Sequence, residues 1–473
     1  MSFHGEHFDG SQDSFMNEDE LIEKIKNCID YIESGQQFIY QESIEETIYI
    51  CLENEYFAEG LILIDSLLEI APYNSELWQF KGACLNGQFN FEDAYFCFEK
   101  SLALNPNDSE ALINKSIAED NLGITHDAIE SLERALSIDP NNEEGLFNLG
   151  VLYERTDNFA DAVQYFLKAV EIDNEYAEAW YEIGFCYESI DELDLALNAY
   201  DEFLALEPIS PYGWYNRGIV LIRMAKFEES AESFDFATRI KDNFASSWFN
   251  CGVAHSSIDN HNKAIECFNK AAKIDKSDET VWFYLGQSHE ALDNMDKALA
   301  CYNNAIEIDE EYSEAFLARG YCYLTLGNEE LSKSDFNEAV RLTFSSDFQQ
   351  DTGDLDELLN FDIEQKIIDT KLELKEAAED YKLWFNLAEY YIIDKQFEAS
   401  EITFNKCIKL NNKFADAYYG KAKIYFIQGK TQEALDLLKY AFTIDPNIKN
   451  EFAKEYPEIN SSKLFERLVG KNK

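Results

Sequence analysis

The chain has 473 residues, of which 46% are hydrophobic and 14% aromatic, so it holds ample apolar material for a folded core. Its formal net charge is −53, from 92 acidic and 39 basic residues. This balance argues against nucleic acid and anionic membrane surfaces as partners, because both are bound through clustered Lys and Arg side chains. It is compatible with a solvated surface, and it would attract basic protein partners.

Residues 1–16 are polar and acidic without any periodicity, so we expect a disordered acidic tail there. Residues 17–40 carry apolar side chains at helical spacing, which predicts an N-terminal capping helix. The apolar positions are Leu21, Ile22, Ile25, Ile29 and Ile32. The start of the chain has no basic segment followed by an apolar one, and no run of about 18 apolar residues occurs. We therefore expect neither a secretory signal nor a membrane span.

From Gln41 onward the sequence repeats itself every 34 residues. The clearest case is residues 143–176, which align with residues 177–210 without a gap. Such a period is typical of a repeat solenoid, in which each unit packs only against its neighbours. The frame predicts twelve repeats over residues 41–448. They begin at Gln41, Ser75, Ser109, Glu143, Ala177, Pro211, Ala245, Glu279, Ser313, Asp347, Tyr381 and Ala415.

Small and large residues alternate at fixed positions of the repeat. Position 4 holds all six tryptophans, positions 8 and 20 are mostly small, position 24 is large and usually aromatic, and position 32 is often proline. Glycine inside a helix costs about 1 kcal/mol relative to alanine, so its recurrence needs a packing reason. We expect the small residues to let two antiparallel helices approach closely. The glycines at position 8 are Gly82, Gly150, Gly184, Gly218, Gly252, Gly286 and Gly320.

The pattern W-x2-[LI]-G-x2-Y, followed by A-x3-[FY]-x2-A and a proline, resembles the tetratricopeptide repeat family over residues 41–448. The resemblance is strongest over residues 143–312. It implies an all-α, right-handed superhelical solenoid of about twelve 34-residue helix-turn-helix repeats with helical caps. In that family the first helix of each repeat lines the concave face, and the second helix lies on the convex face.

The predicted domain order is repeats 1–9 over residues 41–346, a degenerate repeat with a loop over 347–380, and repeats 11–12 over 381–448. Within the degenerate repeat we expect a short first helix at 355–361 and a second helix at 364–378. The alternative is a flexible break between two blocks of repeats. Residues 449–473 contain two short apolar faces and are expected to form a C-terminal cap and tail, or else a self-association helix.

The first helices carry a candidate peptide-binding groove. Asparagine recurs at position 6, in a manner that resembles the asparagine ladder with which some arrays of this family hold an extended peptide. An amide offers both a donor and an acceptor, as a peptide unit requires. Aromatic residues recur beside it at positions 5 and 9. The alternative is that these residues serve only to pack neighbouring repeats. The candidate residues are Asn114, Asn148, Asn216, Asn250, Asn386, Phe147, Tyr181, Phe185, Tyr215, Phe249 and Phe283.

No residue set has the spacing of a catalytic site, so we expect no enzyme activity and no cofactor. The tripeptide Gly429-Lys430-Thr431 lacks the upstream glycine of a phosphate-binding loop. His255 and His289 share position 11, where other repeats have tyrosine. They could form a metal or pH-sensitive pair, or replace an aromatic core residue; we expect the core role and no metal site.

None of the ten cysteines forms a C-x-x-C pair, and six of them recur at two fixed repeat positions. That pattern is typical of small buried residues in a reducing compartment, so a cytoplasmic location is expected.

The sequence thus predicts a non-enzymatic scaffold or adaptor that binds a protein or peptide segment in the concave groove. Glutamates recur at position 2 beside the groove, which favours a peptide with basic flanks. The alternatives are a structural or regulatory module that self-assembles through its end caps, and an accessory activity within residues 345–380. The sequence does not determine the oligomeric state.

Overall fold

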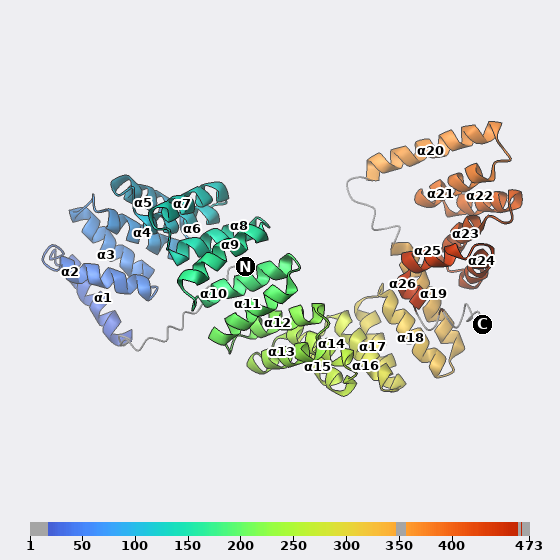
Figure 1. The fold of residues 1–473 in the computed structure, drawn as a ribbon, viewed down its shortest axis with the longest axis horizontal. Coiled ribbons are helices and arrows are strands. Elements are labelled where there is room, and N and C mark those ends of the chain that lie inside the picture. Colours follow the sequence, from blue (N-terminus) through green and yellow to red (C-terminus); the bar gives the residue numbers. More distant parts are fainter. Residues whose placement is uncertain (1–17, 347–355, 462–464, 466–473) are drawn as a thin grey trace. The chain divides into compact units, whose positions relative to one another are not determined.

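The computed structural model describes residues 18–346, 356–461 and 465. Within these residues the regular structure is entirely helical, with 26 helices, labelled α1 to α26 in Figure 1, and no strand. The all-α prediction is therefore confirmed. None of the helices in the described part of the chain combines the length and the apolar character that crossing a bilayer requires.

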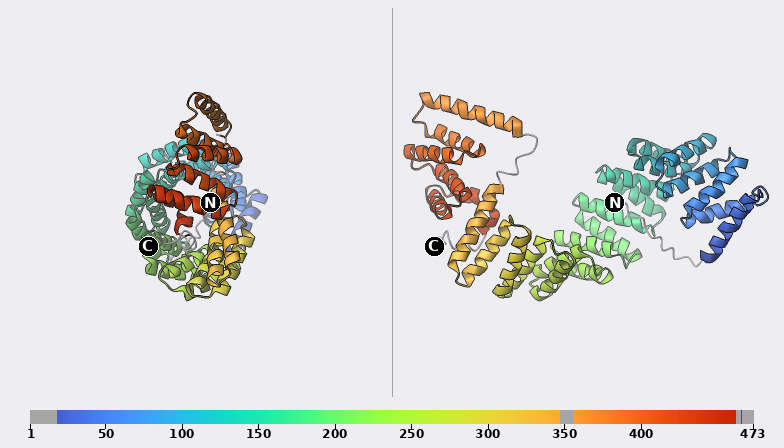
Figure 2. Two further views of the ribbon diagram at one scale, coloured as in Figure 1. Left: turned by 90° about the vertical axis from the view of Figure 1, so that its right-hand side faces the viewer. Right: turned by 180° about the vertical axis from the view of Figure 1, so that it is seen from behind.

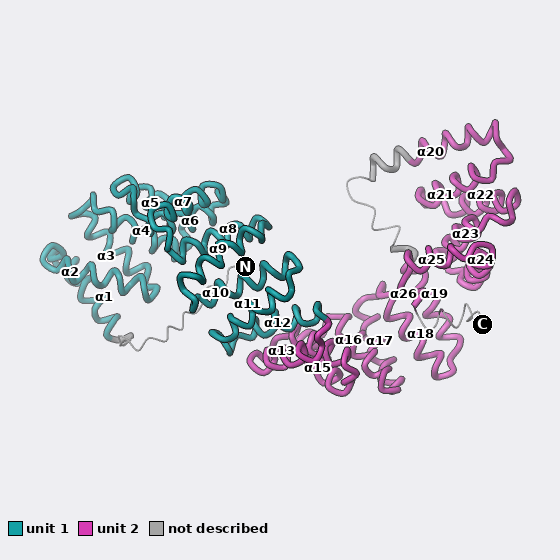
Figure 3. Tube along the Cα trace, in the orientation of Figure 1, with its two compact units in different colours: residues 1–224 teal, residues 225–473 magenta. Residues whose placement is uncertain are grey.

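The chain divides into two compact units, Met1–Met224 and Ala225–Lys473, coloured separately in Figure 3. The helices of the first unit are α1 Glu18–Glu33, α2 Gln41–Glu53, α3 Phe57–Ile70, α4 Ser75–Gly87, α5 Phe91–Leu104, α6 Ser109–Asn121, α7 Thr125–Ile138, α8 Glu143–Arg155, α9 Phe159–Ile172, α10 Ala177–Ser189, α11 Leu193–Leu206 and α12 Pro211–Arg223.

The second unit contains the remaining helices. They are α13 Phe227–Ile240, α14 Ala245–Ser257, α15 His261–Ile274, α16 Glu279–Ala291, α17 Met295–Ile308, α18 Ser313–Thr325, α19 Glu329–Ser346, α20 Asp356–Glu376, α21 Tyr381–Ile393, α22 Phe397–Leu410, α23 Ala415–Ile427, α24 Thr431–Ile444, α25 Asn447–Glu455 and α26 Pro457–Ser461. In both units antiparallel helix pairs follow one another along the chain, as the further views in Figure 2 show.

Helix boundaries follow the 34-residue frame. The first helix of every described repeat begins at the predicted repeat start. Polar N-cap side chains explain several of these starts: Asn142 and Ser210, for example, accept a hydrogen bond from the backbone N–H three residues later. Between the two helices, position 15 adopts a positive φ, as at Asp157 (58°) and Gly123 (78°). This left-handed residue ends the first helix and reverses the chain.

The small and large positions pack against each other as the pattern predicts. Phe166 is fully buried, and a Cβ added to Gly150 would lie 2.6 Å from its ring. The same relation holds between Gly252 and Phe268, at 2.5 Å. Repeat 3 differs at both positions. Buried Ser116 stands in place of the glycine at position 8, and Leu132 stands in place of the aromatic residue at position 24. Glycine therefore accompanies the close approach of the ring in repeats 4 and 7, whereas repeat 11 has Ala388 in the same apolar cluster as Phe404.

Residues 356–376 form the single helix α20, so the prediction of two helices at 355–361 and 364–378 is wrong. The two residues between the predicted segments are Asp362 and Ile363, neither a glycine nor a proline, and the helix continues through them. Its residues Ile363, Ile367 and Leu374 bury themselves against Leu387 and Tyr391 of α21. The loop expected over residues 347–355 lies outside the described residues.

The second unit contains a contact that the repeat pattern does not predict. Helix α19 of repeat 9 packs against α23, the first helix of repeat 12. Phe336 and Val340 of α19 share one apolar cluster with Tyr419 and Phe426 of α23. In a uniform stack α19 would instead meet the first helix of the next repeat. Repeat 12 therefore contacts two parts of the chain, α22 and α19.

Both ends of the described chain cover apolar surface. At the N-terminal end, Leu21, Ile25 and Cys28 of α1 are buried against α2 and α3. At the C-terminal end, residues of α25 and α26 join the cluster that α19 and α23 form. Phe452 is fully buried there. The tail predicted at residues 1–16 lies outside the described residues.

Candidate functional site

Positions 5, 9 and 12 of each first helix are separated by four and three residues, so they lie on one face of that helix. We call the surface formed by these positions and position 6 the first-helix face. In the first unit it includes residues of α8, α10 and α12. The face combines aromatic rings, amides and charged side chains, and it carries most of the candidate residues identified from the sequence.

A pocket of about 480 Å³ opens on the first-helix face between α10 and α12. It brings together four of the candidate residues, Tyr181, Phe185, Tyr215 and Asn216. The remaining lining residues are Glu188, Ser189, Ile219 and Arg223. Phe185 is 39% exposed, so an aromatic ring is available to a ligand. The pocket is open to solvent and offers apolar area together with hydrogen-bonding groups.

Tyr181 is held in place from two sides. Its ring packs edge-on against Tyr200 and Phe203 of α11, with centroids 5.8 and 5.2 Å away. Its hydroxyl accepts a hydrogen bond of 2.8 Å from Nδ2 of Asn216. Burial, reinforced by the charge of Glu182, raises the pKa of Tyr181 to about 12. The phenol thus keeps its proton at neutral pH and can itself donate a hydrogen bond.

Arg223 is paired with acidic groups on one wall of the pocket. Its Nη2 donates to Oδ1 of Asp191 at 2.7 Å, and its Nη1 donates to the backbone carbonyl of Glu188 at 3.0 Å. The Glu188 carboxylate lies 3.3 Å from the same nitrogen. Because these acids already engage the guanidinium, Arg223 offers little free positive charge to an anionic ligand.

Two acidic side chains, on α8 and α10, lie together. Glu182 occupies position 6 of repeat 5, where it interrupts the asparagines, and its carboxyl is hydrogen-bonded to that of Glu154 on α8. Burial, and then the charge of Glu154, raises the pKa of Glu182 to about 8. Two carboxyl groups this close share a proton, because both cannot ionise without strong repulsion.

The other predicted aromatics also serve packing. The half-buried rings of Phe147, Phe249 and Phe283 lie 5.4, 5.8 and 5.9 Å from the position-24 rings of their own repeats. The structure therefore supports a packing role for these three side chains, as the alternative interpretation proposed.

The remaining asparagines do not form one continuous ladder. Asn114 and Asn148 are half-buried in the first unit, and Nδ2 of Asn148 has no hydrogen-bond partner among the described residues. Nδ2 of Asn250 donates to the carbonyl of Ser246 on its own helix. Asn386 is exposed on α21. Only Asn216 lies in the pocket.

Sequence reasoning missed Glu188 and Ser189 as lining residues. Both lie one turn beyond Phe185 on α10, so extending the aromatic stripe to positions 12 and 13 would have identified them. All ten cysteines are free and buried. His255 and His289 are buried as well, and both stand on first helices of the second unit.

Models of the tetratricopeptide repeat match the chain at residues 143–176, 177–210, 245–278, 280–312, 313–345, 381–414 and 403–436, and a further TPR repeat model matches residues 122–157. Together these matches cover just over half of the chain. No curated protein sequence matches it.

Several solved structures resemble parts of the chain. YrrB, described as a TPR protein with an unusual peptide-binding site, is 22% identical, with a TM-score of 0.35 over 37% of this chain and 91% of its own. MamA from Desulfovibrio magneticus is 21% identical, with a TM-score of 0.34 over 36% of this chain and 96% of its own. The C-terminal part of a TPR repeat-containing protein from Cytophaga hutchinsonii is 14% identical, with a TM-score of 0.40 over 58% and 98%.

Most of the family matches begin at or next to the start of a helix pair, and the glycine–aromatic packing of the repeats has the pattern on which the resemblance rests. The chain belongs to the tetratricopeptide repeat family.

Proposed function

We propose that the protein is an interaction scaffold that binds an extended segment of a partner protein across α10 and α12. Its membership of a family of protein-interaction repeats supports the broader role. The pocket lined by Phe185, Tyr215 and Asn216 is the observation that supports the specific site. We propose no catalytic step, since scaffolding requires only binding.

The chemistry of the pocket suits a peptide. Phe185 and Ile219 can contact an apolar side chain, while the amide of Asn216, oriented by Tyr181, can bond to a peptide unit. Acidic groups surround these residues, and Arg223 is already engaged by Glu188 and Asp191. A segment with basic flanks would meet favourable charge, whereas an acidic segment would be repelled.

A peptide library with matched basic and acidic flanks tests this proposal. Binding of fluorescent peptides to the full chain is measured by anisotropy, first on the unaltered protein and then on Asn216→Ala and Phe185→Ala. We expect basic-flanked peptides to bind. Each substitution should weaken binding about 10-fold or more, because it removes a central contact.

The matched control is Phe96→Ala on α5, which removes an exposed aromatic ring from a second helix. It should leave peptide affinity unchanged. The pocket assignment is wrong if no peptide binds, or if Asn216→Ala and Phe185→Ala bind as tightly as the control. Circular dichroism of each variant shows whether the helices are retained.

Self-assembly through the end caps is a second candidate, favoured at one end by exposed apolar residues. Phe38 and Ile39, between α1 and α2, are each 74% exposed. At the other end Phe452, Tyr456 and Phe465 are buried, so these three rings offer little apolar surface for association. Sedimentation over a range of concentrations tests this role. An unchanged monomer mass would eliminate it, whereas dissociation by Phe38→Asp would support it.

We also propose a reducing, cytoplasmic location, supported by ten free and buried cysteines. Thiol labelling of the protein denatured directly from cells measures how many cysteines are reduced there. Full labelling supports the proposal, and stable disulfides would contradict it.

A further inference from the structure

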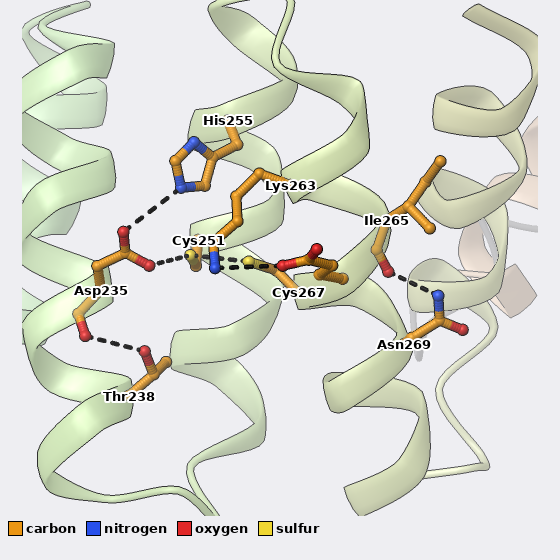
Figure 4. A network of polar contacts seen from close by, with 9 residues as sticks. Asp235, Thr238, Cys251, His255, Lys263, Ile265, Cys267 and Asn269 are labelled. Carbon is orange, nitrogen blue, oxygen red and sulfur yellow. Dashed lines mark hydrogen bonds and ion pairs between the residues drawn. The ribbon is translucent and has the colours of Figure 1, made fainter. Parts of the chain in front are cut away.

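A cluster of sulfur, nitrogen and carboxylate side chains lies between three helices of the second unit (Figure 4). Cys251 and His255 stand one turn apart on α14 and point to the same side. Cys267 faces them from α15, and Asp235 faces them from α13. These four residues come from two successive repeats, so only the stacking of repeats brings them together.

The potential ligand atoms are already close to one another. The sulfurs of Cys251 and Cys267 are 3.0 Å apart, and they and a ring nitrogen of His255 all lie within 4.8 Å of one another. Oδ1 of Asp235 is 3.5 Å from the Cys251 sulfur, and Oδ2 is 3.7 Å from Nε2 of His255. The carboxylate therefore approaches two of the other three side chains.

The ring nitrogens of His255 lack hydrogen bonds to the described residues. His255 is only 8% exposed, yet neither of its ring nitrogens has a hydrogen-bond partner among the described residues. The 3.7 Å separation from Asp235 is too long for a hydrogen bond. Buried polar groups are almost always satisfied, so this imidazole requires an explanation. Its neighbours are side chains of the kind that bind metal ions, so a bound metal ion would explain the imidazole without a hydrogen bond.

We propose that Cys251, His255, Cys267 and Asp235 bind one divalent cation of the zinc class. Two thiolates, one imidazole and one carboxylate make a tetrahedral donor set that zinc accepts and that magnesium and calcium do not favour. Zinc–sulfur bonds of about 2.3 Å place two sulfurs about 3.8 Å apart, so the sulfurs would separate by roughly 0.8 Å. The nitrogen–oxygen separation would need to close by only about 0.3 Å.

Binding releases protons and leaves a small net charge. The two thiols each lose a proton to solvent as their sulfurs bind the cation. With two thiolates and one carboxylate, a divalent ion leaves the site with a single negative charge. Lys263 of α15 lies beside the cluster in Figure 4, where it is 3.4 Å from the Glu266 carboxylate, so it offsets the negative charge of the site only in part. The side chains of Asp235 and Lys263 are 28% and 37% exposed, which provides a route for the ion from solvent.

The next repeat provides an internal comparison. His289 and Cys301 occupy the same repeat positions as His255 and Cys267. However, Leu285 replaces Cys251, and Asn269 replaces Asp235. Two of the four ligands are therefore missing, and the same stacking of helices offers no metal site there. The site in repeat 7 thus depends on four particular side chains and not on the fold alone.

Four protein ligands leave no coordination position for a substrate, so the ion has a structural role. It would join α13 to α14 and α15, and hence repeat 6 to repeat 7. This role differs from peptide binding on the first-helix face. It also departs from our expectation of no metal site, because neither Cys251 nor Asp235 stands out in the sequence pattern.

The test uses the full chain kept under reducing conditions. Metal is removed with a chelator, and Co²⁺ and then Zn²⁺ are added while absorption is recorded. We expect one Co²⁺ per chain, with the visible bands of tetrahedral thiolate coordination, and displacement by Zn²⁺. The midpoint of thermal unfolding should rise when Zn²⁺ is present, because the ion binds only the folded site.

Two ligand variants replace a ligand by the residue that equivalent repeats use, which protects the fold. His255→Tyr places the usual tyrosine at position 11, and Cys267→Ala matches Ala199 of repeat 5. Each should weaken metal binding more than about 100-fold. The controls, His289→Tyr and Cys301→Ala, make the same changes one repeat later and should bind as the unaltered chain does.

Three outcomes would overturn the proposal. The first is the absence of stoichiometric Co²⁺ or Zn²⁺ binding by the reduced protein. The second is equal loss of binding in the ligand variants and the controls. The third is a disulfide between Cys251 and Cys267 in protein isolated with its thiols trapped, together with no metal in the reduced form. Peptide binding is measured separately, so its failure would not affect this result.

Discussion

A glycine at position 8 determines how closely the two helices of a repeat approach, and Gly150 illustrates the requirement. A Cβ at this residue would lie 2.6 Å from the buried ring of Phe166. We expect Gly150→Ala to lower the free energy of unfolding by about 1–3 kcal/mol, the usual cost of overpacking, although alanine favours helix. Urea denaturation of the variant and the parent measures this difference.

The control for that substitution lies on the same helix. A Cβ at Gly145 would come no closer than 3.2 Å to its nearest neighbour, a side-chain atom of Leu136. Gly145→Ala should therefore change stability much less than Gly150→Ala. Equal losses at the two positions would show that the Phe166 ring does not impose the glycine.

The carboxyl pair of Glu154 and Glu182 leads to a second prediction about single residues. The pKa of Glu182 rises from 4.5 to about 8 on folding. Between these values the folded chain binds more protons than the unfolded chain, so this group's contribution to stability is lost as pH rises. Glu182→Gln removes the ionisation. We expect the variant to gain on the order of 1–2 kcal/mol over the parent between about pH 5 and pH 8.

Urea midpoints across this pH range measure that gain. The exposed Glu171→Gln on α9 serves as a control, because it removes a negative charge away from the pair. If the free energy of unfolding of Glu182→Gln and of the parent changes equally with pH, the two carboxyl groups do not share a proton.

At the scale of the helix, local patterns predict local structure well. The first helices begin where the frame predicts, because caps such as Asn142 and the turn residues recur with it. Residues 356–376 lack the small–large pattern, and their single helix α20 was not foreseen. The contact of α19 with α23 also lay beyond prediction, since it joins residues distant in the sequence.

In the candidate site, too, the sequence pattern predicts some features and not others. The recurrence of aromatics and asparagines identified Tyr181, Phe185, Tyr215 and Asn216, which meet in one pocket. Recurrence alone could not show that Tyr181 and Phe147 both pack on the position-24 ring of their own repeat, whereas Tyr181 also lines the pocket and Phe147 does not. Nor could it identify the neighbours of a side chain across repeats, which depend on how the helices stack.

The packing of the C-terminal helix α25 leads to a prediction about the stability of this helix. Phe452 is fully buried and packs against Tyr419, Tyr456 and Phe465. Phe452→Ala should destabilise this region by about 3–5 kcal/mol through the cavity it leaves. Hydrogen exchange should then increase in α23 and α25, while helices of the first unit remain as protected as in the parent.

That selectivity follows from the nearest-neighbour stability of repeat proteins. A uniform rise in exchange throughout both units would show that the array unfolds as a single cooperative body. An unaffected α25 would show that the Phe452 ring contributes little to its anchoring.

For the molecule as a whole, the net charge of −53 governs encounter with partners. A basic peptide should associate faster than an acidic peptide of equal length, because long-range attraction steers its approach. Its association rate constant should fall steeply as salt rises from about 0.01 to 0.15 M, where the screening length shortens from about 30 to 8 Å. Stopped-flow fluorescence measures both rates. A rate independent of salt would contradict steering by the whole surface.

The docking of α19 on α23 also has a consequence for how the chain folds. Nearly all other packing joins helices close in sequence, which favours rapid folding, whereas this contact must close a loop that contains α20, α21 and α22. Among the described residues of the first unit, the main helix contacts join elements close in sequence, so we expect this unit to fold rapidly. We therefore expect the contact between α19 and α23 to form after the helix pairs that neighbour each other in sequence.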